Sequence, residues 1–166
     1  DVSGFQFDPK LLILCAAQSV PVCVMHSQGL PKTMQNNPSY GNVVLDVYDF
    51  LETQIELLQS SGVPRSQIIA DPGIGFGKTM RHNLALLEKI SLFHGLGVAL
   101  MLGMSRKGFI GKVTGEKEAK NRVIGSVAAA MVGASQGVQV FRVHDVKETR
   151  QAFNIWQATH FGDFYG

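Results

Sequence analysis

Four short apolar runs, separated by longer segments with helical periodicity, constrain the fold of this 166-residue chain more than any other feature. The runs contain β-branched residues and cover residues 20–25, 67–70, 98–102 and 138–143. Segments with a helical pattern follow them, at residues 43–58, 83–93, 122–136 and 145–159. Because strands that alternate with helices form parallel βαβ units, the sequence predicts a single α/β domain over residues 1–166.

The composition is that of a globular chain with little net charge. Hydrophobic residues make up 45% of the sequence, and the formal net charge of +2 is too small to predict a nucleic-acid or membrane partner. Cys15 and Cys23 lie in apolar segments without metal-ligand spacing, so we expect buried free thiols and a reducing compartment. No apolar run reaches the length of a membrane span and no signal peptide is recognisable, which favours a cytoplasmic protein.

Polar residues gather where each apolar run ends. They are Asp1 and Ser3, then His26, then Asp71, then Ser105, Arg106 and Lys107, and finally Arg142, His144 and Asp145. In a (β/α)₈ barrel the carboxyl ends of all strands converge on one mouth, where such enzymes carry out their chemistry. A full barrel takes about 250 residues, and residues 1–4 look like the end of a further strand. The pattern therefore favours part of a barrel over a doubly wound sheet.

The stretch IIADPGIGFGKT, residues 68–79, ends like a phosphate-binding P-loop but does not have its spacing. Pro72 stands where the first glycine of a P-loop is needed, and proline has no N–H to offer a phosphate. Asp71, at the end of the apolar run, is therefore a better candidate for a functional residue than Lys78. Lys78 and Thr79 are expected to begin a solvated helix. An ordinary glycine-rich turn between strand and helix is the structural alternative.

The motifs DVSG, PVCVMHSQGLPKTMQ, IIADPGIGFGKT, GMSRKGFIG and FRVHDV resemble, in this order, the later motifs of the dihydropteroate synthase family of pterin-binding enzymes. The resemblance extends from Asp1 to about Ala152. It implies a (β/α)₈ barrel, of which this chain would cover the second half, from the end of strand four to helix eight. It also implies a transferase of folate biosynthesis, the target of sulfonamides. That enzyme joins 6-hydroxymethyl-7,8-dihydropterin diphosphate to 4-aminobenzoate and releases diphosphate.

The resemblance assigns roles to the residues at the strand ends. The pterin would be bound by Asp71, Met25, Gly103, Lys107 and Arg142, the 4-aminobenzoate by Phe76, Ser105 and Lys107, and the diphosphate by Arg142 and His144. The catalytic residues would be Lys107, Arg142 and His144. These roles suit the chemistry, because a carboxylate can accept two adjacent N–H groups of a pterin, and cationic groups stabilise a leaving diphosphate.

Some of these residues also have purely structural explanations. Met25 fits core packing, and His26 fits a structural hydrogen bond. Asp145 is expected to be the N-cap of the last helix. The remaining histidines, His82, His94 and His160, are expected at the surface.

The resemblance also implies a cofactor and partners. Mg²⁺ would be the cofactor, with its main ligand in residues that precede this chain and no metal ligand among the residues given. The partners would be the two small-molecule substrates and a second copy in a homodimer, formed near residues 128–132. The chain alone is expected to be inactive, because three strands and two mobile loops of the family would be missing. Two alternatives stay open: a barrel that transfers a methyl group from methyltetrahydrofolate to a corrinoid, and a non-catalytic half-barrel.

Overall fold

The computed structural model describes residues 1–5, 8, 10–18, 20–30 and 32–162 of the chain. Within these residues, parallel strands form one four-stranded sheet in the order β1-β2-β3-β4. The strands are β1 (Val22–Met25), β2 (Ile68–Asp71), β3 (Ala99–Leu102) and β4 (Val140–Phe141). All four lie within the predicted apolar runs or one residue beyond them, so the predicted parallel α/β class is confirmed.

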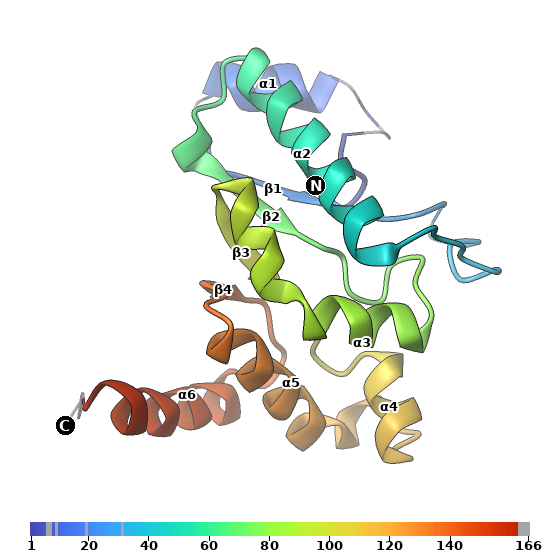
Figure 1. Ribbon diagram of the computed structural model, residues 1–166, viewed down its shortest axis with the longest axis vertical. Coiled ribbons are helices and arrows are strands. Elements are labelled where there is room, and N and C mark those ends of the chain that lie inside the picture. The colour runs from blue at the N-terminus through green and yellow to red at the C-terminus, as the bar shows by residue number, and fades with distance from the viewer. Residues whose placement is uncertain (6–7, 9, 19, 31, 163–166) are drawn as a thin grey trace.

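Helices occupy the segments between the strands. The α-helices are α1 (Lys10–Gln18), α2 (Val43–Ser60), α3 (Met80–Glu88), α4 (Gly108–Thr114), α5 (Val123–Ser135) and α6 (Val146–Phe161). Short 3-10 helices are η1 (Arg65–Gln67), η2 (Ile90–Leu96) and η3 (Ala119–Asn121). Figure 1 shows the strands following one another through the centre of the molecule, with α1 beyond β1, α2 crossing in front of β1 toward α3, and α5 and α6 beyond β4.

The strand order separates the two architectures considered above. Each strand pairs in parallel with the next one along the chain, with Val22 opposite Ile68, Ile69 opposite Ala99, and Met101 opposite Val140. A doubly wound sheet reverses its strand order at a switch point, and the described strands contain no such reversal. The connectivity is that of successive units of a (β/α)₈ barrel.

Asp1 lies where a further parallel strand would pair with β1. Its amino group donates to the carbonyl of Cys23, and its own carbonyl accepts the N–H of Met25 at 3.1 Å. This alternation is the hydrogen-bond pattern of a parallel ladder. The Asp1 carboxylate then accepts the N–H groups of Ser3 at 2.9 Å and Phe5 at 2.6 Å, which closes the turn that follows. This pairing agrees with the prediction that residues 1–4 are the end of a further strand.

Parts of the predicted secondary structure are wrong. The helix expected over residues 83–93 is two elements, α3 and η2, because the chain leaves helical geometry at Lys89, with φ −109° and ψ 21°. The last strand does not extend over residues 138–143 but ends at Phe141. Helices α1 and α4 are present although they were not predicted. The apolar α1 sequence has no clear polar face and α4 spans only seven residues, so neither gives a clear helical pattern in the sequence.

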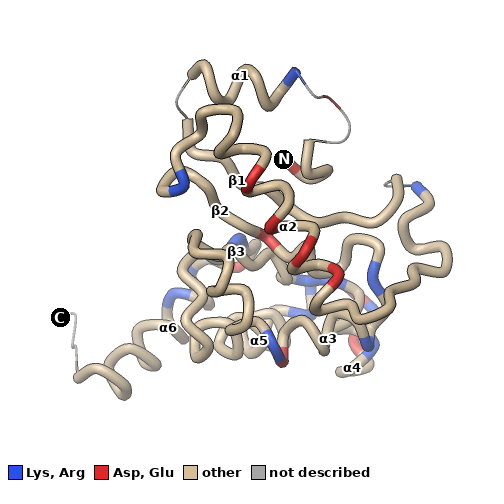
Figure 2. The backbone as a smooth tube through the Cα atoms, turned by 45° about the horizontal axis from the view of Figure 1, so that its top comes forward, with Lys and Arg blue, Asp and Glu red and all other residues tan. Residues whose placement is uncertain are grey.

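Helix α2 illustrates how the core is built. Val47, Leu51 and Leu58 are buried, as the periodicity predicts. The helical pattern of residues 43–58 also predicts Leu57 on this face, but Leu57 is 44% exposed. Ile55 is buried instead, because position 55 lies within the apolar stripe and position 57 outside it. The opposite face carries acidic residues, which Figure 2 shows along α2.

The two cysteines only partly match expectation. Cys15 and Cys23 are free thiols, but both are half-buried rather than buried. Cys23 is accessible because it lines a hollow at the end of the sheet. Over the part of the chain that the structure describes, no helix combines the length and apolar character needed to cross a bilayer.

Candidate active site at the strand ends

A hollow of about 200 Å³ opens at the carboxyl ends of the strands. Its lining residues are Asp1, Val2, Cys23, Met25, Asp71, Phe76, Met101 and Arg142. Four residues from the predicted substrate site, Met25, Asp71, Phe76 and Arg142, therefore lie around one cavity although they are far apart in the sequence. Asp1, Asp71 and Arg142 are among the polar residues that the sequence predicts to converge, and the hollow brings these three together.

Asp71 is the buried acid of this hollow. It is the last residue of β2 and only 1% exposed, and its Oδ1 accepts the N–H of Gly73 at 2.8 Å. Burial raises the pKa of Asp71, while the Gly73 N–H and the nearby charges of Lys107, Arg142 and Lys78 lower it. The carboxylate thus lies among cationic side chains at the edge of the hollow.

The glycine-rich turn after Asp71 passes very close to the end of β1. At Gly73, where φ is +69°, an added Cβ would lie 1.8 Å from the carbonyl oxygen of His26. At Gly77, with φ +61°, it would lie 2.4 Å from the carbonyl oxygen of Gln28. Only glycine fits these positions, since both the backbone geometry and the space exclude a side chain.

Side chains from elsewhere bind the carbonyls of this turn. Lys107 donates to Ile74, Gln35 to Gly75 at 2.6 Å, Lys78 to Phe76 at 3.0 Å, Tyr40 to Gly77 at 2.7 Å, and Asn83 to Lys78 at 3.4 Å. The N–H of Gly75 donates in turn to Asn83 Oδ1 at 2.7 Å. Because these hydrogen bonds occupy the carbonyl groups of the turn, they fix its conformation and thereby the position of Phe76.

Lys107 lies between the turn and the acid. Its ammonium group is 4.5 Å from the ring centroid of Phe76 and donates to the carbonyl of Ile74. Burial lowers the pKa of Lys107 to about 8, with Arg142 acting in the same direction and Asp71 opposing it. The structure therefore brings together Lys107, Phe76 and Asp71, as the site prediction requires.

Arg142 packs its guanidinium group over Gly103. A Cβ at Gly103 would lie 2.7 Å from Arg142 Nη2, so the absence of a side chain there makes room for the guanidinium. The backbone N–H of Arg142 donates to the carbonyl of Leu102 at 2.9 Å. This contact extends the pairing of β3 with β4 by one hydrogen bond and fixes where the arginine leaves the sheet.

Ser105 and His144 form a separate contact beside the hollow. The Ser105 hydroxyl lies 3.2 Å from the His144 N–H and 3.1 Å from its Nδ1. Ser105 is buried and does not line the hollow that contains Phe76, so its predicted role toward 4-aminobenzoate stays a prediction. The strand predicted to end near residue 143 would make Arg142 and His144 alternate out of it on the same side, but β4 ends at Phe141 and both residues lie in the turn after it.

Lys78 corrects a second expectation. It was expected to be solvated, yet it is 3% exposed, and its Nζ lies 2.8 Å from His26 Nδ1. Thr79 does begin the helix as predicted, because its hydroxyl accepts the N–H of His82 as the N-cap of α3. Lys78 therefore precedes the helix, and its long side chain folds back beneath the turn. In the sequence, only Thr79 as a possible N-cap indicates that Lys78 lies before the helix and not on its surface.

The structural roles proposed for other polar residues are partly right. His26 is a structural hydrogen-bonding residue, and burial lowers its pKa to about 3. Asp145 is the N-cap residue of α6, but its side chain makes no capping bond and pairs with Arg106 instead. His160 is exposed, whereas His94 is half-buried and contacts the carbonyl of Gln136 at 2.8 Å.

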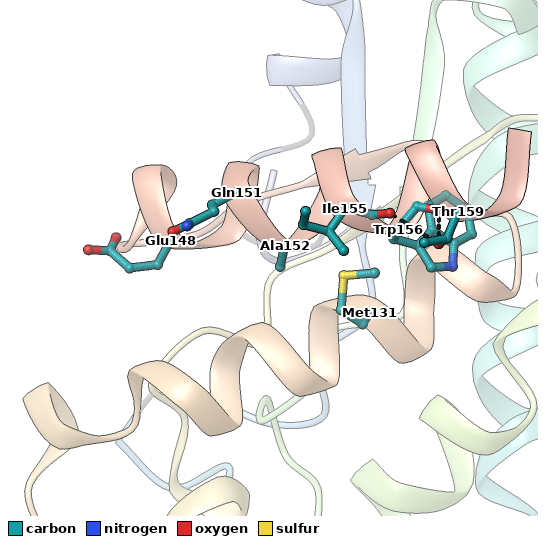
Figure 3. A pocket seen from close by; sticks show the side chains of 7 residues that line it. All are labelled: Met131, Glu148, Gln151, Ala152, Ile155, Trp156 and Thr159. Carbon is teal, nitrogen blue, oxygen red and sulfur yellow. Dashed lines mark hydrogen bonds between the residues drawn. The ribbon is translucent and has the colours of Figure 1, made fainter. Parts of the chain in front are cut away.

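A larger hollow of about 520 Å³ lies between α5 and α6, away from the strand ends. Figure 3 shows Met131 of α5 reaching toward Ile155 and Trp156 of α6. The lining is mostly apolar and lacks the paired acid and cations found near Asp71. We therefore assign the candidate chemistry to the smaller hollow, despite its size.

Comparison with known proteins gives consistent results. The family model described as "Pterin binding enzyme" matches residues 1–144. A dihydropteroate synthase of Haemophilus influenzae is 41% identical over 159 residues, which are 96% of this chain and 57% of that protein. The chain thus spans a little over half the length of this curated relative.

Solved structures are similar over the same extent. The dihydropteroate synthase of Stenotrophomonas maltophilia matches with a TM-score of 0.94 and 39% identity, over 98% of this chain and 61% of that one. The enzyme of Xanthomonas albilineans, solved in complex with 7,8-dihydropteroate, matches with a TM-score of 0.90 and 37% identity, over 97% and 58%. This chain therefore has the fold of part of a (β/α)₈ barrel.

Proposed function

Because this chain belongs to the pterin binding enzyme family, we propose that the full-length protein containing it is a dihydropteroate synthase. The observation that carries the proposal is the hollow lined by Asp71, Phe76 and Arg142, with the ammonium group of Lys107 against the Phe76 ring. The substrates are 6-hydroxymethyl-7,8-dihydropterin diphosphate and 4-aminobenzoate. The X. albilineans relative, with 7,8-dihydropteroate bound, supports this choice of product.

The pterin is held by Asp71. A pterin presents adjacent N–H donors, and an ionised carboxylate accepts two of them at once. Burial raises the pKa of Asp71, and the nearby cations act against this rise and so favour the ionised, accepting form. Met25 and Gly103 bound the flat ring, and the guanidinium of Arg142 over Gly103 offers it a stacking surface.

The reaction forms one bond and breaks another. The amine nitrogen of 4-aminobenzoate attacks the exocyclic CH₂ of the pterin, the C–O bond to diphosphate breaks, and diphosphate leaves with the electron pair. The amine then loses a proton. Phe76 and Lys107 border the place of the aminobenzoate, with Ser105 as its third predicted contact, and Lys107, Arg142 and His144 stabilise the charge that develops on the diphosphate.

Mg²⁺ is the proposed cofactor of the whole enzyme. In the described ranges, no group of three His, Cys, Asp or Glu side chains could hold a metal ion. Its ligands would come from the substrate diphosphate and from other parts of the protein.

We also propose a homodimer in a cytoplasmic location. A second apolar hollow of about 370 Å³, between α3, α4 and α5, is lined by Leu84, Ala128 and Val132 among others. Ile124 on the same helix is 85% exposed. A second copy of the chain would cover this surface, and the free thiols suit a reducing compartment.

Product formation tests the proposal and its alternatives. The full-length protein, supplied with both substrates, should release one diphosphate for each 7,8-dihydropteroate formed. A methyltransferase of the same family would instead demethylate methyltetrahydrofolate in the presence of a corrinoid, and it has no need of Lys107 or of the pair Arg142 and His144. A non-catalytic half-barrel would do neither. The 166-residue chain alone is expected to make no product.

A further inference from the structure

Lys78 is a buried lysine that has no role in the proposed reaction. Its ammonium group has three acceptors within reach: Nδ1 of His26 at 2.8 Å, the carbonyl of Phe76 at 3.0 Å and the carbonyl of His26 at 3.5 Å. An ammonium group has three donors, so each has an acceptor here, although burial lowers the pKa of Lys78 to about 7. His26 is itself 6% exposed, and its ring packs edge-on against Phe50 at 4.9 Å.

These contacts connect two segments that meet at the active site. His26 directly follows β1, and Phe76 belongs to the glycine turn that follows β2. The turn is already pressed against β1 at Gly73 and Gly77, where no side chain fits. Lys78 is the side chain that bonds to both segments, and it bonds to Phe76 itself.

We infer that Lys78 is a positioning residue, which anchors the turn between Asp71 and Thr79 to the end of β1 and thereby sets the place of the Phe76 ring. The inference rests on the proposed function for its catalytic consequence. The rigidity of the turn does not depend on the proposed function. Lys78 touches no substrate in this account and acts through Phe76.

Lys78 also faces a set of charged and titratable groups. These are His26 after β1, Asp71 at the end of β2, His82 in α3 and Lys107 before α4. Its positive charge lowers the pKa of Asp71, alongside the larger effects of Lys107 and Arg142. Removal of that charge should therefore raise the pKa of Asp71 and move the acidic limb of pterin binding to higher pH.

The test compares Lys78→Met with wild type in the full-length protein. Methionine keeps an unbranched chain that is one atom shorter, but removes the donors and the charge. The matched control is Lys147→Met, the same change at an exposed position of α6. In a second pair, His26→Leu removes the acceptor for Lys78, whereas His26→Asn keeps an oxygen near the place of Nδ1.

Two readouts follow the turn and the site separately. Hydrogen exchange at the amides of residues 73–78 should become faster by at least about tenfold in Lys78→Met and His26→Leu, but not in Lys147→Met or His26→Asn. The kcat/KM for 4-aminobenzoate should fall by about tenfold to a hundredfold, mainly through KM, because small misplacements of binding groups are costly. The pH at which acidification weakens binding of the pterin substrate should be higher in Lys78→Met alone.

The outcomes separate this inference from the proposed function. If wild type makes no dihydropteroate, the proposed function fails, and the exchange data still decide the role of Lys78. If Lys78→Met does not fold, the two His26 variants carry the test. The inference is overturned if the folded variants keep wild-type exchange at residues 73–78 and wild-type KM values, whatever their melting temperatures, because a merely stabilising contact gives that result.

Discussion

Arg106 and Asp145 join the turn after β3 to the turn after β4 through a bidentate ion pair, in which Arg106 Nε lies 3.0 Å from Asp145 Oδ2. Arg106 has a left-handed backbone with φ 59°, which is unfavourable for a residue with a side chain. Its N–H donates to Ser126 Oγ at 2.8 Å, and its carbonyl accepts from Arg122 at 3.0 Å. The strained residue is thus held by three partners between Ser105 and Lys107.

Loss of this ion pair should impair catalysis without direct loss of a ligand contact. Asp145→Asn and Arg106→Ala should each lower kcat/KM by about tenfold, because Lys107 and His144 flank the two paired residues and would lose their common support. Arg106→Gly should be more stable than Arg106→Ala, since glycine accepts a positive φ, but equally impaired in kcat/KM. Steady-state kinetics with thermal melts on the full-length protein measure both effects. Full activity of Arg106→Gly would show that the backbone geometry alone, and not the ion pair, positions the site.

His144 should discriminate between ligands with and without diphosphate. His144→Ala should weaken the diphosphate-bearing pterin by about 1.5–3 kcal/mol, the range for a hydrogen bond to a charged group, and leave the bare pterin nearly unchanged. Calorimetry with the two ligands measures the difference, and His160→Ala in the exposed end of α6 is the control. Equal losses for both ligands would remove His144 from the diphosphate site.

His26 should make the stability of the fold sensitive to acid. Its pKa is lowered in the folded state to about 3 from an ordinary value of 6.5, so the unfolded chain takes up the proton first. The stabilising contribution is therefore complete above pH 6.5 and decreases as the pH falls toward 3. At pH 5 the wild-type protein should have lost about 2 kcal/mol more of its free energy of unfolding than His26→Asn, each relative to pH 7.5. Urea titrations at the two pH values measure this, and identical pH dependence of both proteins would contradict a buried neutral His26.

The apolar surface of α5 should control assembly. Val132 is 44% exposed beside the hollow between α3, α4 and α5, and Val132→Glu would place a charge in a dimer contact. Size-exclusion chromatography with light scattering should show a dimer for wild type and a monomer for this variant. The control is Leu45→Glu, on an α2 position that is 49% exposed. A dimer that persists in Val132→Glu would place the contact elsewhere.

The strand pattern of the sequence predicts the fold class because it depends on local chemistry. Apolar runs of four to six residues and the helical segments between them determine a parallel α/β sheet, and polar residues after each run then converge by geometry. Asp71, Met25 and Arg142 could be placed at one mouth on that basis, and they line one hollow. Only the resemblance assigned their ligands.

The contacts that support the site could not be predicted in the same way. Lys78 is buried among three acceptors, and two of them belong to His26, which is 52 residues away in the sequence. Arg106 and Asp145 are 39 residues apart, and either looks like an ordinary solvated charge when taken alone. A local pattern gives no partner for such residues, and without a partner the default expectation is exposure.

The central claim is that the buried carboxylate of Asp71 receives the pterin, and calorimetric titration of 7,8-dihydropteroate into the full-length protein tests it most directly. Wild type should bind, and so should Asp49→Asn, an exposed acid on α2 that serves as the control. Asp71→Asn should bind at least about a hundredfold more weakly, because the amide offers one acceptor in place of two and each charge-assisted hydrogen bond contributes about 1.5–3 kcal/mol. Unchanged affinity in a folded Asp71→Asn variant would contradict the account.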